Sequence, residues 1–134
     1  MAYFEWENKY SVGHTLMDSH HQKLFDIINR LHEAMLQGQG GSIAQDIIKE
    51  LIDYTRYHFG EEEKMLADVN YPKLSMHKDL HQKFISDLHE IEHNVTKGVE
   101  FLTAIKLLRS TQSWLQDHIM EVDAGYSDLV KNYS

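Results

Sequence analysis

Seven histidines and carboxylates lie on stripes of apolar side chains that repeat with the period of an α-helix. They are His21, His58, Glu62, His77, His81, His118 and Asp123. An apolar stripe on a helix packs into the protein interior, where an imidazole or a carboxylate is costly to bury unless a positive group holds it. We therefore predict that the fold gathers these residues into one two-metal site inside a helical bundle.

The spacing of apolar residues is helical rather than alternating along most of the chain, and Pro72 is its only proline. This pattern predicts an all-α fold, and the short turns predict an antiparallel up-down-up-down four-helix bundle. We expect Asp18 to cap the first helix and Pro72 to take the first position of the third. The whole chain, 1–134, is expected to be one domain with an N-terminal arm at 1–17, the bundle at 18–123, and a C-terminal tail or short helix at 124–134.

The composition limits the partners and ligands of such a bundle. Lys+Arg 13 against Asp+Glu 21 gives a formal net charge of -8, which argues against nucleic acid and against an anionic membrane as partners. The chain shows no signal-peptide pattern at its start and no apolar stretch of roughly 20 residues, so we expect a cytoplasmic protein. The absence of cysteine excludes disulfides and iron-sulfur clusters, and leaves imidazole and carboxylate ligands, which suit iron, zinc or manganese.

An antiparallel arrangement brings the candidate ligands to one height. Residues equidistant from a tight turn are level in two antiparallel helices, because each residue rises by about 1.5 Å along the axis. His21 and His58 are equidistant from the centre of the first turn, and around the second turn Glu62 pairs with His77 and His58 with His81. Each of these residues also continues the apolar stripe of its helix, so all of them should point at the core.

The fourth helix completes this layer, but only if it is locally irregular. His118 comes to within about two residues of the level of His81 across the third turn. Asp123 follows His118 by five residues, which on a regular α-helix leaves it about 140° round the axis. We therefore predict a π-type turn between His118 and Asp123, a widening that occurs often at functional sites.

The order H, H-x-x-x-E, H-x-x-x-H, H-x-x-x-x-D along the four helices resembles the hemerythrin family, in particular the bacterial hemerythrins. Supporting motifs extend over nearly the whole chain. They are Trp6, SVGH at 11–14, DSHHQKLF at 18–25, YHFGEEE at 57–63, HKDLH at 77–81 and WLQDHIMEVD at 114–123.

The resemblance implies two non-haem iron ions bridged by an oxo or hydroxo group, with dioxygen as the ligand. It implies that His77, His81 and His118 hold one iron, that His21 and His58 hold the other, and that Glu62 and Asp123 bridge them. If both carboxylates and a solvent-derived oxygen bridge two six-coordinate ions, five histidines divide three to two and leave one ion an open position. Helical spacing places Trp114, Leu115 and Ile119 nearest that position, and in the family the equivalents of Trp114 and Leu115 line the oxygen pocket.

These expectations favour a non-enzymatic protein that binds dioxygen reversibly for storage, transport or delivery. HKDLH lacks the glutamate of an H-E-x-x-H metalloprotease, and no further acid, base or nucleophile is expected at the open position. Two alternatives stay open. One is an oxygen or redox sensor that acts through ligand-dependent helix packing, and the other is di-iron peroxidase or nitric-oxide chemistry. A protein partner is compatible with oxygen delivery and with the sensor function.

The remaining histidines and acids have simpler interpretations. His89 and His93 are spaced like a ligand pair but lie far round the helix from His77, so we expect them on a solvated face. His20 should face outward, because it is rotated about 100° from His21. We expect His14 to be structural, His32 to pack in the core, and Glu61 and Glu63 to lie on a solvated face.

Overall fold

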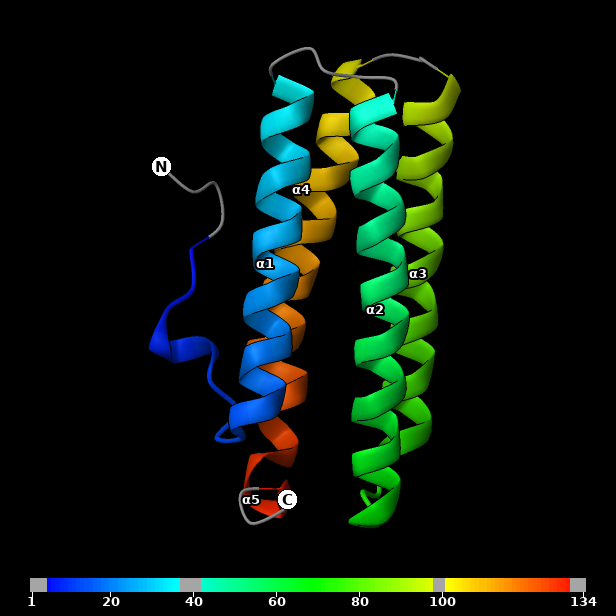
Figure 1. The fold of residues 1–134 in the computed structure, drawn as a ribbon. Helices are drawn as coiled ribbons and strands as arrows, with labels where there is room; N and C mark the ends of the chain where they lie inside the picture. Colours follow the sequence, from blue (N-terminus) through cyan, green and yellow to red (C-terminus); the bar gives the residue numbers. More distant parts are fainter. Residues whose placement is uncertain (1–4, 37–41, 98–100, 131–134) are drawn as a thin grey trace.

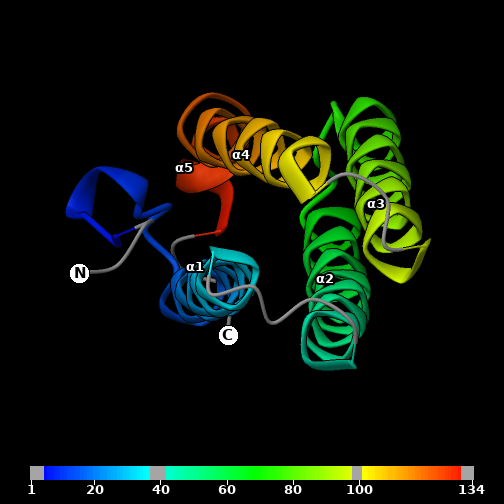
Figure 2. The ribbon, with the colours of Figure 1, turned by 90° about the horizontal axis from the view of Figure 1, so that it is seen from above.

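The protein is a bundle of four long helices, seen in a computed structural model that describes residues 5–36, 42–97 and 101–130. The helices are α1 (Thr15–Leu36), α2 (Ser42–Asp68), α3 (Leu74–Lys97) and α4 (Phe101–Asp117). Each runs antiparallel to the next along the chain, and seen from above they surround one core (Figures 1 and 2). The described ranges contain no strand, so the predicted all-α up-down-up-down fold is confirmed.

Shorter elements flank the bundle. A 3-10 turn, Asn8–Tyr10, lies in the N-terminal arm. Helix α4 continues without a break into a π-helical turn, His118–Val122, then a 3-10 turn, Asp123–Tyr126, and the short helix α5, Ser127–Val130. The predicted turns around 38–41 and 98, the first four residues of the arm and the end of the tail at 131–134 lie outside the described residues.

Helix α1 begins at Thr15, three residues before the predicted start, and Asp18 is not its cap. The ring Nδ1 of His14 accepts the backbone N–H of Met17 at 3.3 Å, so His14 caps the helix. The Asp18 carboxylate reaches back and accepts the N–H of Val12 at 2.8 Å and the Ser11 hydroxyl at 2.6 Å. Asp18 therefore fixes the arm to the first turn of α1, and the expected structural role of His14 is confirmed.

The turn between α2 and α3 is tight, but Pro72 precedes the third helix instead of opening it. Asn70 takes a left-handed backbone conformation with φ 56°, and the Tyr71 N–H bonds to the Leu66 carbonyl at 2.9 Å. Pro72 lies in the following turn, which the Leu74 N–H closes on the Tyr71 carbonyl at 3.3 Å. Helix α3 begins only at Leu74 because that bond spans three residues rather than the four of an α-helix.

The N-terminal arm packs against the outer side of α1 (Figure 2). Trp6, Tyr10 and Phe25 form an aromatic cluster with ring centroids 5.1–5.7 Å apart, and the Tyr10 hydroxyl accepts a hydrogen bond from the Gln116 side chain on α4. Gly13 has φ +75°, and a Cβ there would lie 3.1 Å from the Ser127 hydroxyl. A glycine is needed at this position because the backbone is left-handed and the C-terminal segment is close.

The two halves of the bundle differ in what fills them. The half next to the 38–41 connection is packed mainly with apolar side chains, among them Ile28, Leu31, Met35, Ile48, Leu51, Leu88, Ile91, Ile105 and Leu108. The half next to the α2–α3 turn also buries histidines and carboxylates. Within the described ranges, no helix has the length and apolarity needed to cross a bilayer.

Candidate metal centre

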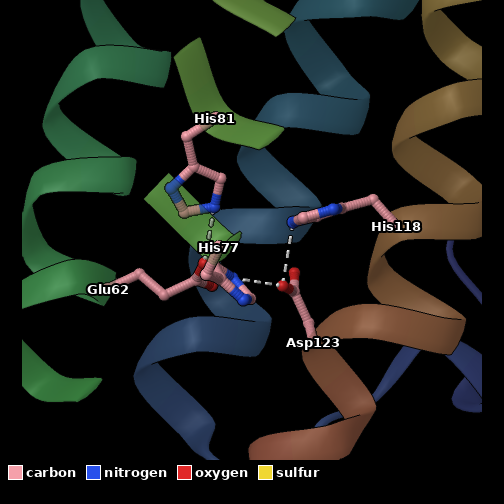
Figure 3. A group of neighbouring side chains, drawn as sticks. All are labelled: Glu62, His77, His81, His118 and Asp123. Carbon is pink, nitrogen blue, oxygen red and sulfur yellow. Dashed lines mark hydrogen bonds and ion pairs between the residues drawn. The ribbon is translucent and has the colours of Figure 1, made fainter. Parts of the chain in front are cut away.

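The seven predicted ligands come together in one buried cluster. His21 lies on α1, His58 and Glu62 on α2, His77 and His81 on α3, and His118 and Asp123 at the two ends of the π-helical turn. Each is at most 4% exposed. Figure 3 shows five of them turned toward one another: Glu62, His77, His81, His118 and Asp123. The structure thus brings together every residue that the sequence predicted for the site.

Glu62 divides its two carboxylate oxygens between two groups of histidines. Its Oε1 lies 2.8 Å from Nε2 of His77 and 3.0 Å from Nε2 of His81. Its Oε2 lies 3.5 Å from Nε2 of His58 and 3.7 Å from Nε2 of His21. The carboxylate therefore stands between the α3 histidines on one side and the α1 and α2 histidines on the other.

Asp123, in the segment that follows α4, makes the same division. Its Oδ1 lies 2.9 Å from Nε2 of His77 and 3.0 Å from Nε2 of His118, whereas its Oδ2 lies 3.3 Å from Nε2 of His21. The π-helical turn makes this possible, since the Asp123 N–H bonds to the carbonyls of His118 and Ile119 and the extra residue in the turn rotates Asp123 toward the core. The predicted widening between His118 and Asp123 is confirmed.

The ligand atoms form two overlapping groups that could each hold a cation. Glu62, His77, His81, His118 and Asp123 make a group of five whose ligand atoms all lie within 4.8 Å of one another, and His21, His58 and Glu62 make a second group of three. Imidazole nitrogens with carboxylate oxygens suit iron, zinc or manganese.

Orphaned polar atoms at the centre of the cluster fit a bound cation. Both ring nitrogens of His21, Nε2 of His81 and His118, and Oδ1 of Asp123 are buried and make no hydrogen bond within the described residues. The short contacts already given for these atoms are ion pairs only. Buried polar atoms in native proteins are nearly always satisfied, so several in one place need an explanation. Metal coordination would satisfy every one of these atoms that faces the centre.

The electrostatics of the cluster also favour positive charge. Burial opposes ionisation of Glu62, but the neighbouring imidazoles of His21 and His77 outweigh it and hold the pKa of this carboxyl well below its usual range. Burial likewise opposes ionisation of Asp123, yet its histidine neighbours lower the pKa of Asp123. Burial would lower the pKa of His21 and of His77, but the neighbouring carboxylates of Glu62 and Asp123 raise these pKa values to about 9 and about 10. Burial lowers the pKa of His58 to about 3. Two carboxylates are thus balanced by two protonated imidazoles, whose place metal cations can take.

Three further side chains hold the ligands from outside. Nδ1 of His20 lies 2.9 Å from Nδ1 of His58, and Oε2 of Glu63 lies 2.8 Å from Nδ1 of His81. The buried Tyr126 hydroxyl donates to Oε2 of Glu62 at 2.8 Å. These contacts link the predicted ligands to α1, α2 and the C-terminal turn.

Two of these three side chains correct predictions from the sequence. His20 is 4% exposed, so the expectation that it faces outward is wrong: it lies in the interface between α1 and α2. Glu63 was expected on a solvated face, but its side chain is only 24% exposed and is bonded to His81. A signal for both roles was present in the sequence, because His20 directly precedes His21 and Glu63 directly follows Glu62.

The predicted oxygen-pocket residues lie on α4 and in its π-helical turn. Leu115 and Ile119 are buried, at 1% and 0% exposure. The ring of Trp114 stacks on His118 at 4.6 Å and on Phe84 at 4.7 Å. Trp114 therefore lies directly against a predicted ligand, and the role of all three side chains toward dioxygen stays a prediction.

The other histidines fall where the sequence placed them. His89 and His93 are exposed on α3, as expected. His32 is 6% exposed on α1, in the apolar half of the bundle, consistent with core packing.

The fold and the cluster define a class of protein: a helical bundle whose core gathers histidines and carboxylates that could hold cations. A family model described as the hemerythrin HHE cation binding domain matches residues 12–130. The chain belongs to the hemerythrin family. This membership implies binding of non-haem iron.

Individual proteins support this assignment. The bacteriohemerythrin of Pseudomonas aeruginosa (strain LESB58) is 34% identical over 132 residues, which cover 98% of this chain and 84% of the relative. The bacteriohemerythrin of Clostridium acetobutylicum is 32% identical over 133 residues, covering 93% of this chain and 99% of the relative. A crystal structure of wild-type hemerythrin superimposes with a TM-score of 0.86 at 25% identity, covering 97% of this chain and 99% of that one.

Proposed function

We propose that this protein binds dioxygen reversibly at a di-iron centre, bridged by an oxo or hydroxo group, and serves in oxygen storage, transport or delivery. In this proposal His77, His81 and His118 would hold one iron, His21 and His58 would hold the other, and Glu62 and Asp123 would be shared between the two. The family membership and the geometry of the carboxylates support the proposal. Its location in the cytoplasm stays a prediction from the sequence.

The observation that supports the proposal is the unequal division of histidines around the carboxylates of Glu62 and Asp123. One oxygen of Glu62 and one of Asp123 turn toward the three-histidine group, and the other oxygen of each turns toward the two-histidine group. The first group therefore offers five donor atoms and the second offers four. Sites with fewer protein ligands keep positions open for an external molecule, as in iron oxygenases with two histidines and one carboxylate. The two-histidine side is accordingly where dioxygen would bind.

The chain's own residues supply the surroundings that reversible binding needs. Ferrous iron bound by these residues would supply the electrons for holding dioxygen. Leu115 and Ile119 are buried apolar side chains on the helix that carries His118, and they exclude water from the site. Trp114 covers the ring of His118 and limits its movement. An apolar lining that keeps water away also slows the entry of protons, which promote irreversible oxidation.

The test is anaerobic reconstitution of the metal-free protein with ferrous iron, followed by metal analysis and titration with dioxygen. We expect two irons per chain and a change in absorption that reverses when dioxygen is removed. His21→Gln should lower the iron count or abolish reversibility, whereas His93→Gln, which changes an exposed histidine of α3, should behave as the unmodified protein. A single iron per chain, or a colour change that never reverses, would contradict the proposal.

The same preparation separates the alternatives. Continuous consumption of peroxide or nitric oxide with full turnover would favour di-iron enzyme chemistry. Partner binding that depends on oxygen or on the redox state would favour a sensor.

A further inference from the structure

The outer nitrogens of two predicted iron ligands have partners of different chemistry. On the two-histidine side, Nδ1 of His58 meets Nδ1 of His20 at 2.9 Å. On the three-histidine side, Nδ1 of His81 meets the Glu63 carboxylate at 2.8 Å. One ligand is therefore held by an imidazole and the other by a carboxylate.

His20 is fixed in place by packing. Its ring lies edge-on to His58, with centroids 5.1 Å apart at 82°, and also contacts the rings of Tyr54 at 5.9 Å and Tyr57 at 5.4 Å. With only 4% of its surface exposed, it has little freedom to turn away. His20 therefore sets the orientation of the His58 ring.

Glu63 is anchored differently. The face of the His81 ring is stacked on Phe59 at 3.6 Å and 2°, so the ring plane is set and its Nδ1 points at Glu63. Glu63 also lines a cavity of about 260 Å³ between α2 and α3, together with Arg56 and Gln82. Because its side chain is 24% exposed, the carboxylate is only partly desolvated.

The two partners act differently on a ligand histidine. When Nε2 of a histidine binds a cation, the ring proton lies on Nδ1 and is donated to the outer partner. A carboxylate accepts this proton in a charge-assisted bond and makes the ring a stronger donor to the metal, whereas a neutral imidazole draws on the proton less.

We propose that His20 and Glu63 are positioning residues that give the two sides of the metal centre unequal donor strength. Glu63 makes His81 a strong donor, so the three-histidine side binds its cation more tightly and favours the oxidised metal. His20 orients His58 without adding charge, so the two-histidine side stays the weaker one. This inference rests on the proposed two-metal site and not on any binding of dioxygen.

The first measurement is Zn²⁺ affinity of the metal-free full chain, by competition with a chromophoric chelator. Removing an outer partner of a metal ligand typically costs about 10- to 100-fold in affinity. We expect Glu63→Gln to weaken the tighter class of Zn²⁺ site by that factor. Glu61→Gln is the matched control, because Glu61 has the same kind of side chain, is exposed, and lies two residues before Glu63. Equal losses in both variants would mean a long-range charge effect and would overturn the role of Glu63.

The second measurement uses His20. His20→Ala should weaken the weaker class of site, and His20→Gln should recover most of the loss, since an amide oxygen can accept the proton of His58. His20→Glu should strengthen that class, because it places a carboxylate behind His58. If His20→Ala does not fold, the Gln and Glu variants decide the matter. Equal affinity in these two would overturn the role of His20.

The third measurement is the reduction potential of the iron-loaded protein. Glu63→Gln should raise it, and by more than Glu61→Gln does, since a weaker donor favours the reduced metal. A potential that is the same in both variants would contradict the proposal. Because Zn²⁺ does not bind dioxygen, failure of this inference is distinguishable from failure of the proposed oxygen binding.

Discussion

Tyr126 gives the sharpest single test of how the site is held together. This tyrosine is completely buried in the turn that follows Asp123, and its hydroxyl donates to Oε2 of Glu62 at 2.8 Å. Burial and the negative charges of Glu62 and Asp123 raise the pKa of Tyr126 well above its usual value, so the hydroxyl stays protonated and remains a donor. Tyr126→Phe removes this one bond and keeps the ring.

The expected cost follows from the charge of the acceptor. A hydrogen bond to a charged group contributes about 1.5–3 kcal/mol. An unfolding entropy of about 2.1 cal/mol/K per residue gives about 280 cal/mol/K for a chain of 134 residues, so each kcal/mol lowers Tm by about 3.5 °C. The metal-free variant should therefore melt about 5–11 °C below the unmodified protein.

Thermal and urea unfolding followed by circular dichroism measure this difference. Tyr57→Phe is the matched control, because it removes the same hydroxyl from a tyrosine that is 54% exposed. A Tm for Tyr126→Phe that equals the Tm of the control would refute the reasoning, since the buried bond to Glu62 would then contribute nothing.

Three further predictions concern pH, packing and the backbone. In the metal-free protein the pKa of His21 is raised to about 9, so its stabilising contribution is fully present below pH 6.5 and is lost as the pH rises through 9. The pKa of His58 is lowered to about 3, so folding becomes less favourable as the pH falls from 6.5 toward 3. Urea midpoints after chelation should thus decline on both sides of pH 6.5, and a flat profile would contradict the charge balance. Leu115→Ala should lower the free energy of unfolding by about 2–5 kcal/mol and speed autoxidation of the oxygenated protein. Leu115→Met should lower the free energy of unfolding by less than about 1.5 kcal/mol. An unchanged autoxidation rate in the alanine variant would exclude the pocket role. Gly13→Ala should lower the free energy of unfolding by about 1–2 kcal/mol, because Gly13 has a positive φ. Gly60→Ala should raise it by about 0.8–1 kcal/mol, because Gly60 lies in mid-helix with open space where a Cβ would be. A change of the same sign for both variants in urea unfolding would contradict the backbone argument.

Helical periodicity predicted the fold and the cluster because both depend on which residues face the bundle axis. His21 and His58 are level across a turn and share the inward face, and these two properties can be counted from a sequence. The π-helical turn could be predicted as well, since His118 and Asp123 cannot both face the core from one regular α-helix.

The same periodicity failed where a residue lies on the flank of a helix. His20 is rotated away from the axis, but the flank of α1 is covered by α2, so the side chain is buried between two helices instead of exposed. Glu63 is likewise on the flank of α2, where α3 brings His81 within reach. Burial at such positions depends on how closely and at what angle neighbouring helices pack, and one chain's residue pattern does not encode this directly. The cap of α1 was missed for a related reason: Asp18 is a favoured capping residue, but its carboxylate is occupied by the arm.

The gathering of all ligands in one half of the bundle has a consequence for how the protein is made. The other half is packed with apolar side chains from all four helices and contains none of the predicted ligands. A small zinc domain is unfolded until its metal arrives. Because the apolar half needs no metal to pack, we expect this chain to fold before a cation binds, so that binding changes only the opposite end of the bundle.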